Sequence, residues 1–256
     1  MKVKPEWSQR LLRKGLLVDE TYGLFAGWAF CQSVEANLFT GLSGRQSTQG
    51  WDDEVVSTVR RRLRHFDLVK PLIILAQRGL PLRDWRDCLR LWVGATEEPF
   101  HTFATQWLEA ERARGRSAIK SEDLLSVVAT AAARTSRAPP LSDYSRIRAA
   151  RDLLKTAVDL GMLVGSGPVR TFASIAMSDH ALVFYAHMIA DLEGDASKVP
   201  QSPLWRLAFL DPQEVHLTLL HLHQFRRLDY QIAGSLVQLT LPFSSAIEFA
   251  RQAPQL

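Results

Sequence analysis

The feature that most constrains this fold is a change in hydrophobic periodicity near residue 160. Before it, apolar residues recur at three- and four-residue intervals, which is typical of amphipathic helices. After it, a helix followed by two short apolar runs around a Gly-containing turn occurs twice, which is typical of β-hairpins. The sequence therefore predicts a mainly α fold in which short β-hairpins appear only late in the chain.

The helical part divides into several segments. An apolar stripe predicts one helix over 19–39, and a loop rich in Gly and Ser follows it at 41–50. A second helix is expected from Asp52, with acids in its first turn and arginines near its end, as the helix dipole favours. Pro71 and Pro81 are each expected in a first helical turn. Further helices are predicted over 83–94, 98–114 and, with Ser121 as N-cap, up to residue 133.

Two units with a helix and then a hairpin follow the proline-containing break at 136–141. The first has a helix over 144–160 and the turn Gly165-Ser-Gly-Pro168; the second has Asp211 as N-cap and a turn at Gly234. Such a unit is the closing half of a winged helix-turn-helix. We therefore expect a helical domain over 1–138 and tandem winged-helix-like units over 139–198 and 199–256.

Charge is unevenly distributed along the chain. The net charge is only +4, but residues 1–152 carry 24 basic and 18 acidic side chains, whereas the rest carries 7 and 9. Arginine outnumbers lysine by 24 to 7, and guanidinium groups suit phosphate contacts. A GC-rich genome would produce the same arginine excess without any ligand. The charge is thus compatible with nucleic-acid binding by the N-terminal part.

The helix before the first hairpin carries the most specific basic pattern. Arg148, Arg151 and Lys155 are spaced along one face of this helix, at the place of a recognition helix, and Arg170 lies on the following wing. The alternative is a solvated face opposite Ile147, Leu154 and Val158. We predict phosphate or base contacts from these four cations.

Two other arginine clusters are candidates for contacts with a nucleic-acid backbone. One, at the end of the second helix, contains Arg60, Arg61 and Arg64; the other, at the end of a later helix, contains Arg112, Arg114 and Arg116. The alternative is a solvated, dipole-satisfying helix end for the first cluster and a loop kept soluble by its arginines for the second. The second hairpin unit has few basic residues, so we expect it to bind protein.

No enzymatic motif occurs in the sequence. Phosphate-binding loops, dinucleotide fingerprints, zinc-protease motifs and nucleophile elbows are missing. The histidines at 216, 221 and 223 do not converge on one metal, and Cys31 and Cys88 are expected to be buried thiols. We predict no enzyme activity, no metal and no cofactor. Without an apolar leader or membrane-length segment, a cytoplasmic location is expected.

The order of segments resembles the BrxA family of BREX phage-exclusion systems over residues 10–190. The resemblance begins with Gly15-Leu-Leu-Val-Asp-Glu-Thr21. It continues through an Arg-ending helix at 55–63, a Leu-Trp helix at 89–93, Phe100 and Phe103, and a helix start at 121–123, to Gly161-Met-Leu before a hairpin. It implies a small helical DNA-binding protein without enzymatic activity. The unit over 200–252 is additional to this pattern.

Two functions follow from these observations. The first is a non-enzymatic accessory protein of a bacterial phage-defence system, which binds double-stranded DNA and works with other defence-system proteins. The alternative is an interaction scaffold of a larger complex without direct DNA contact, in which the Trp-rich helices around Trp85, Trp92 and Trp107 form subunit contacts.

Overall fold

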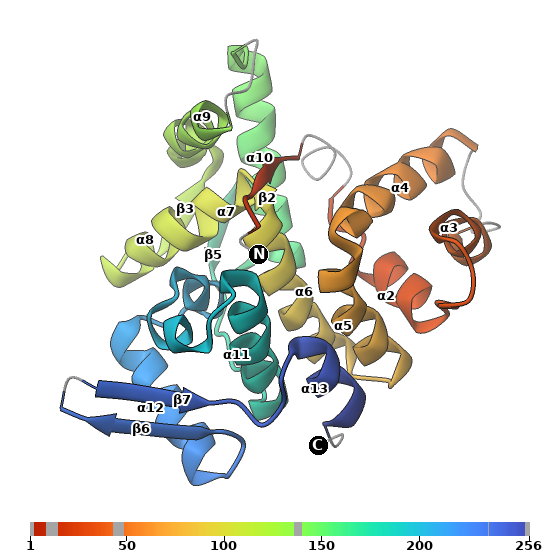
Figure 1. Ribbon diagram of the computed structural model, residues 1–256. Helices are drawn as coiled ribbons and strands as arrows, with labels where there is room; N and C mark the ends of the chain where they lie inside the picture. Colours follow the sequence, from red (N-terminus) through yellow and green to blue (C-terminus); the bar gives the residue numbers. More distant parts are fainter. Residues whose placement is uncertain (1–2, 9–14, 43–48, 136–139, 235, 254–256) are drawn as a thin grey trace.

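The computed structural model describes residues 3–8, 15–42, 49–135, 140–234 and 236–253, and these are mainly helical (Figure 1). The α-helices are α2 (Val18–Ala26), α3 (Val34–Leu42), α4 (Gln49–Arg62), α5 (Phe66–Gln77), α6 (Leu82–Thr96), α7 (Phe100–Thr102), α8 (Glu109–Ala113), α9 (Leu125–Arg134), α10 (Asp143–Asp159), α11 (Asp179–Glu193), α12 (Pro212–Gln224) and α13 (Ala246–Gln252). A π-helical stretch, Phe103–Leu108, joins α7 to α8, and 3-10 turns occur at Leu63–His65, Ser121–Leu124, Ala196–Gln201 and Pro203–Ala208.

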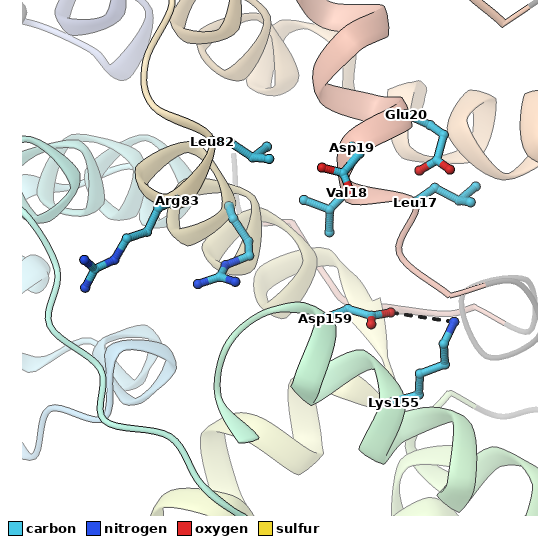
Figure 2. A pocket seen from close by; sticks show the side chains of 9 residues that line it. Leu17, Val18, Asp19, Glu20, Leu82, Arg83, Lys155 and Asp159 are labelled. Carbon is cyan, nitrogen blue, oxygen red and sulfur yellow. Dashed lines mark ion pairs between the residues drawn. The ribbon is translucent and has the colours of Figure 1, made fainter. Parts of the chain in front are cut away.

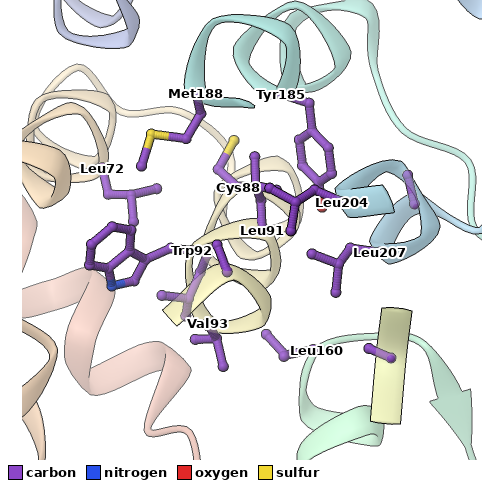
Figure 3. Packing of buried hydrophobic residues seen from close by; sticks show 14 of the residues in the cluster. Leu72, Cys88, Leu91, Trp92, Val93, Leu160, Tyr185, Met188, Leu204 and Leu207 are labelled. Atoms are coloured by element: carbon purple, nitrogen blue, oxygen red, sulfur yellow. The ribbon is translucent and has the colours of Figure 1, made fainter. Parts of the chain in front are cut away.

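Helix α6 is the centre of the core. Nearly every residue from Trp85 to Ala95 is buried, and neighbouring elements pack on it from several sides (Figure 3). At Gly94, an added Cβ would lie only 2.4 Å from the Leu207 side chain, so glycine lets the 3-10 turn 203–208 approach closely. Because Trp85 and Trp92 are buried here, they are not available as subunit contacts, and that expectation was wrong.

The single helix expected over 19–39 is wrong, because the chain breaks between α2 and α3. Gly27 ends α2, and the side chain of Asn37 bonds the segment between the helices. Its Oδ1 accepts from the Ala29 backbone nitrogen at 2.7 Å, and its Nδ2 donates to the Ala29 carbonyl at 2.9 Å. The apolar residues at helical spacing therefore belong to two separate helices, α2 and α3, which contact each other.

Most other helices lie where the periodicity predicts them, but Pro71, which was expected in a first helical turn, lies inside α5. The segments expected at 83–94 and 144–160 correspond to α6 and α10, and Asp211 is the N-cap of α12, with Glu214 completing a capping box. Ser121 is not an N-cap; it begins a 3-10 turn, while Asp123 bonds the Lys120 backbone nitrogen.

A three-stranded sheet stands beside α9 and α10. Its order is β3 (Ala118–Lys120), β5 (Val169–Phe172) and β4 (Leu163–Val164), with both pairs antiparallel. The expected hairpin at 162–175 is therefore present, and a strand from before the 136–141 break pairs with it. The other sheets have two strands each: β1 (Glu6–Trp7) with β2 (Glu97–Glu98), and β6 (Asp229–Ala233) with β7 (Leu236–Thr240).

The C-terminal elements return to the N-terminal helices. After the β6–β7 hairpin, which projects from the lower part of the molecule, α13 packs against α5 and α11 (Figure 1). Arg78, at the end of α5, donates a hydrogen bond of 2.8 Å to the carbonyl of Ala250. One hydrophobic cluster extends from Trp7 to Ala253. The boundaries proposed at 138 and 198 stay predictions, and contacts cross both.

Among the described residues, no helix combines the length and the apolar character that a membrane crossing requires.

Candidate nucleic-acid interface

Helix α10 presents one face to the core and the other to solvent. Ser142 caps its first turn by accepting a hydrogen bond from the Ser145 backbone nitrogen, and Ala150, Leu153 and Ala157 on the inner face are buried. The outer face consists of side chains at successive turns of the helix: Tyr144, Ile147, Arg148, Arg151 and Lys155. We call these five residues the α10 face.

The α10 face is both basic and apolar. Tyr144 is 73% exposed and Ile147 41% exposed, although Ile147 was expected on the apolar inner side and Tyr144 was not singled out. The alanines and leucines of the inner face fix which residues point outward, and that spacing is the signal that identifies both. Exposed apolar groups beside arginines are the combination that contacts base edges as well as phosphates.

The cations of the α10 face form only long ion pairs or none with the described residues. The nearest carboxylate oxygens lie 3.9 Å away, from Asp152 for Arg148 and from Asp159 for Lys155. Arg151 has no ion-pair partner within the described residues. Such exposed pairs contribute little energy, so these side chains can exchange their partners for phosphate at small cost.

The hairpin beside α10 has an exposed glycine-rich tip, Gly165 to Pro168. Gly165 has a φ of +115°, and a Cβ there would lie 3.2 Å from the Val169 carbonyl oxygen, so the turn requires glycine. Arg170 is half-buried at the base of this tip, where Nη1 lies 3.4 Å from the Val169 carbonyl and Nε is buried without a hydrogen-bond partner. Arg170 lies on β5, which pairs with β4, and β4 in turn contacts α10.

The C-terminal end of α10 is fixed to α6 by two arginines. Arg90 is buried; its Nη1 donates to the Leu160 carbonyl at 3.0 Å and to Asp87 at 2.8 Å. The Arg86 guanidinium lies against Gly161, the left-handed residue that follows the helix. Cations favour a helix C-terminus, so α6 sets the position of the whole α10 face.

The predicted cluster at 60–64 mainly holds the N-terminal strand. Arg61 donates to the Trp7 carbonyl, and Arg64 pairs with Glu6 at 2.7 Å. The neighbouring Arg62, which is buried, pairs with Glu97 and donates to the Leu16 carbonyl. Arg60 is exposed, with no partner among the described residues.

The arginines of the predicted cluster at 112–116 bind other groups of the protein. Arg112 donates to the Phe209 carbonyl at 2.6 Å and lies over that residue's ring. Arg116 pairs with Glu111 at 2.9 Å and with Asp123 at 2.6 Å. Arg114 pairs with Glu111 but leaves 73% of its side chain exposed. These arginines lie on elements other than α10, so the structure does not place the three predicted clusters on one element.

A cavity of about 580 Å³ lies at the C-terminal end of the α10 face. Figure 2 shows Lys155 and Asp159 of α10 facing the start of α2, with Arg83 of α6 opposite. Asp19 and Glu20 supply two more carboxylates, and Arg86 a further cation. Among the described residues that line this cavity, three positive and three negative groups balance, so these residues give no preference for an anion.

The three histidines on α12 make contacts within the protein. His216 bonds the Tyr230 hydroxyl, while His221 pairs with Asp179 at 3.1 Å and His223 with Asp229 at 3.2 Å. The described part of the chain contains no group of three or more His, Cys, Asp or Glu residues arranged to hold a metal. Cys88 is buried, and burial raises its pKa, but Cys31 is exposed, contrary to expectation.

Comparisons of the chain with protein-family models, with curated proteins and with solved structures find no match.

Proposed function

We propose that this protein binds double-stranded DNA through a winged-helix unit whose recognition helix is α10. Along the chain the elements follow in the order α8, β3, α9, α10 and the β4–β5 hairpin, and in the sheet the strands lie in the order β3-β5-β4. This topology supports the winged-helix assignment. In helix-turn-helix proteins the second of two successive helices enters the major groove. Here that helix carries the exposed α10 face, and this is the observation on which the proposal rests.

The elements after α11 form a second unit of the same kind in this proposal. Helix α12 precedes the β6–β7 hairpin, but Leu217 on this helix and Phe225, which follows its last residue, are 66% and 58% exposed. On the hairpin, Ile232 is 45% exposed. Exposed apolar side chains with few cations beside them favour protein contacts over phosphate contacts, so we assign this unit, unlike the α10 face, to protein partners.

The cellular role is a further part of the proposal and rests on the sequence resemblance alone. The chain would act in the cytoplasm as a non-enzymatic accessory protein of a BREX-like phage-defence system, together with other proteins of that system. The alternative, an interaction scaffold without DNA contact, draws its support from the exposed apolar residues of α12. Co-purification with neighbouring gene products without any affinity for DNA would favour the scaffold.

Fluorescence anisotropy with a labelled random duplex at low salt tests the DNA-binding proposal. The triple variant Arg148→Ala, Arg151→Ala and Lys155→Ala should lose most of the affinity, because its three cations share one face. A matched control, Lys70→Ala, Lys198→Ala and Arg251→Ala, removes the same charge from α5, the 196–201 turn and α13. Equal affinities for the two variants would contradict the proposal.

A further inference from the structure

A second cavity, distinct from the α10 face, opens where α11, the turn after α12 and the C-terminal segment meet. Its volume is about 210 Å³, which is below the usual range of about 300–1,000 Å³ for ligand sites and matches a small, single-ring molecule. The polar side chains that line it are Asp179, His180, Arg226 and Arg227, and the apolar ones include Phe243 and Phe249.

One side of this cavity is positively charged. Arg226 and Arg227 follow the C-terminus of α12, where Arg226 is exposed and the Nε of Arg227 is buried without a hydrogen-bond partner. The first turn of α11 adds the positive end of a 15-residue helix. Among the described residues that line the cavity, Asp179 is the one carboxylate, and it is engaged by His221 at 3.1 Å. The cavity therefore favours a negatively charged group.

His180 lines the same cavity and has a buried polar atom without a hydrogen-bond partner among the described residues. The residue is 6% exposed, and its Nε2 is buried without a hydrogen-bond partner. Burial lowers the pKa of His180, with Arg78 and Arg227 acting in the same direction and Asp84 opposing them. The lowered pKa favours the neutral form of the imidazole, and in the tautomer with a proton on Nε2 that nitrogen is a hydrogen-bond donor. A buried donor without a partner is costly.

The remaining walls of the cavity are apolar and include flat surfaces. Phe249 lies 4.9 Å from the His180 ring and 5.9 Å from the Phe243 ring, measured between centroids. Val183 and Pro242 complete this side. Aromatic walls of this kind accept another ring in an edge or offset-stacked arrangement.

We propose that this cavity binds a small aromatic carboxylate. The carboxylate would accept hydrogen bonds from Arg226 and Arg227, which suit it because guanidinium groups bind carboxylates in bidentate fashion. The ring would lie against Phe243 and Phe249. The inference does not depend on DNA binding, since no residue of the α10 face lines this cavity.

Benzoate is the probe for this proposal, and isothermal titration calorimetry supplemented by thermal shift is the measurement. Benzoate should bind saturably and raise the Tm. Benzyl alcohol, which keeps the ring without the charge, and acetate, which keeps the charge without the ring, should each bind at least about tenfold more weakly. Absence of benzoate binding at about 10 mM, where a millimolar Kd gives near-saturation, would overturn the proposal, as would benzyl alcohol binding equally well.

Variants locate the site. Arg226→Gln with Arg227→Gln should weaken benzoate binding at least about tenfold, whereas the control Arg60→Gln with Arg134→Gln, at exposed helix positions that do not line the cavity, should leave it unchanged. If the double variant does not fold, Arg226→Gln alone, at an exposed residue, provides the same comparison. Wild-type affinity in the Arg226 variants would place benzoate elsewhere and contradict the assignment.

Discussion

Arg90 on α6 donates a hydrogen bond of 3.0 Å to the carbonyl of Leu160, 70 residues further along the chain. The same guanidinium pairs with Asp87 at 2.8 Å, and both side chains are almost completely buried. The Tyr185 hydroxyl donates to the Asp87 carbonyl at 3.0 Å, which adds α11 to the network. The position of α10 is therefore set by a charged group inside the core.

Replacing Arg90 should strongly destabilise the protein. In Arg90→Met the Asp87 carboxylate stays buried without its partner, and burial already raises the pKa of this group. Loss of one partner of a buried pair costs about 3–5 kcal/mol of the free energy of unfolding, measurable by urea denaturation. The control Lys70→Met removes an exposed pair with Asp67 and should cost about 1 kcal/mol at most. Similar losses of unfolding free energy in the two variants would show that the buried Arg90–Asp87 pair stabilises the fold no more than an exposed pair does.

The contact between Gly94 and Leu207 should show non-additive energetics. Gly94→Ala places a methyl group against the buried Leu207 side chain, and overpacking of this kind costs about 1–3 kcal/mol. Leu207→Ala alone should cost about 2–5 kcal/mol because it opens a cavity. The double variant should lose less than the sum of the two, since the new methyl partly fills that cavity. Additive losses in denaturation would argue against direct contact.

Local chemistry explains which elements were predictable. Asp211, Pro212 and Glu214 are enough to define the start of α12, and the Gly165 turn is enough to define its hairpin, so both were predicted from the sequence. The break between α2 and α3 was missed because it depends on the side chain of Asn37, which leaves no trace in hydrophobic periodicity.

For the candidate site, the sequence predicted which cations of α10 share a face but not which groups hold the other arginines. Spacing alone placed Arg148, Arg151 and Lys155 on one face, because helix geometry fixes this from sequence. It did not reveal that Arg112 and Arg116 are held by distant groups such as the Phe209 carbonyl and Asp123. Those partners come from elsewhere in the chain, so only the tertiary structure shows them.

Stability should fall on mild acidification because of His187. This buried imidazole donates from Nδ1 to the Val183 carbonyl at 2.9 Å and accepts at Nε2 from the Phe243 nitrogen at 3.3 Å. Burial lowers its pKa, with the backbone contacts and Glu248 opposing the shift. The unfolded chain therefore binds the proton first, and the free energy of unfolding decreases as the pH falls from about 6.5 through the folded-state pKa.

Urea unfolding at several pH values between about 8 and 5 measures this effect, and His187→Gln is the comparison. The variant should show a smaller decrease, and His180, whose pKa burial also lowers, contributes to what remains. Identical pH profiles for the two proteins would show that His187 does not couple protonation to folding.

The apolar part of the α10 face should contribute to DNA binding without contributing to the fold. Tyr144→Ala and Ile147→Ala remove exposed side chains, so each should change the free energy of unfolding by about 0.5 kcal/mol or less. If these side chains contact bases, DNA affinity should fall while its salt dependence stays constant, because no phosphate contact is lost. Anisotropy titrations at several salt concentrations decide this. Unchanged affinity would restrict DNA contact to the cations.

The central claim is that the cations of the α10 face neutralise DNA phosphates, and the salt dependence of duplex affinity tests it most directly. Each phosphate contact contributes about 0.9 to the slope of log K against log salt. The Arg148→Ala, Arg151→Ala, Lys155→Ala variant should therefore have a slope smaller than wild type by about 2–3. The control variant at Lys70, Lys198 and Arg251 should keep the wild-type slope. Equal slopes for the wild type and the α10 variant would contradict the account.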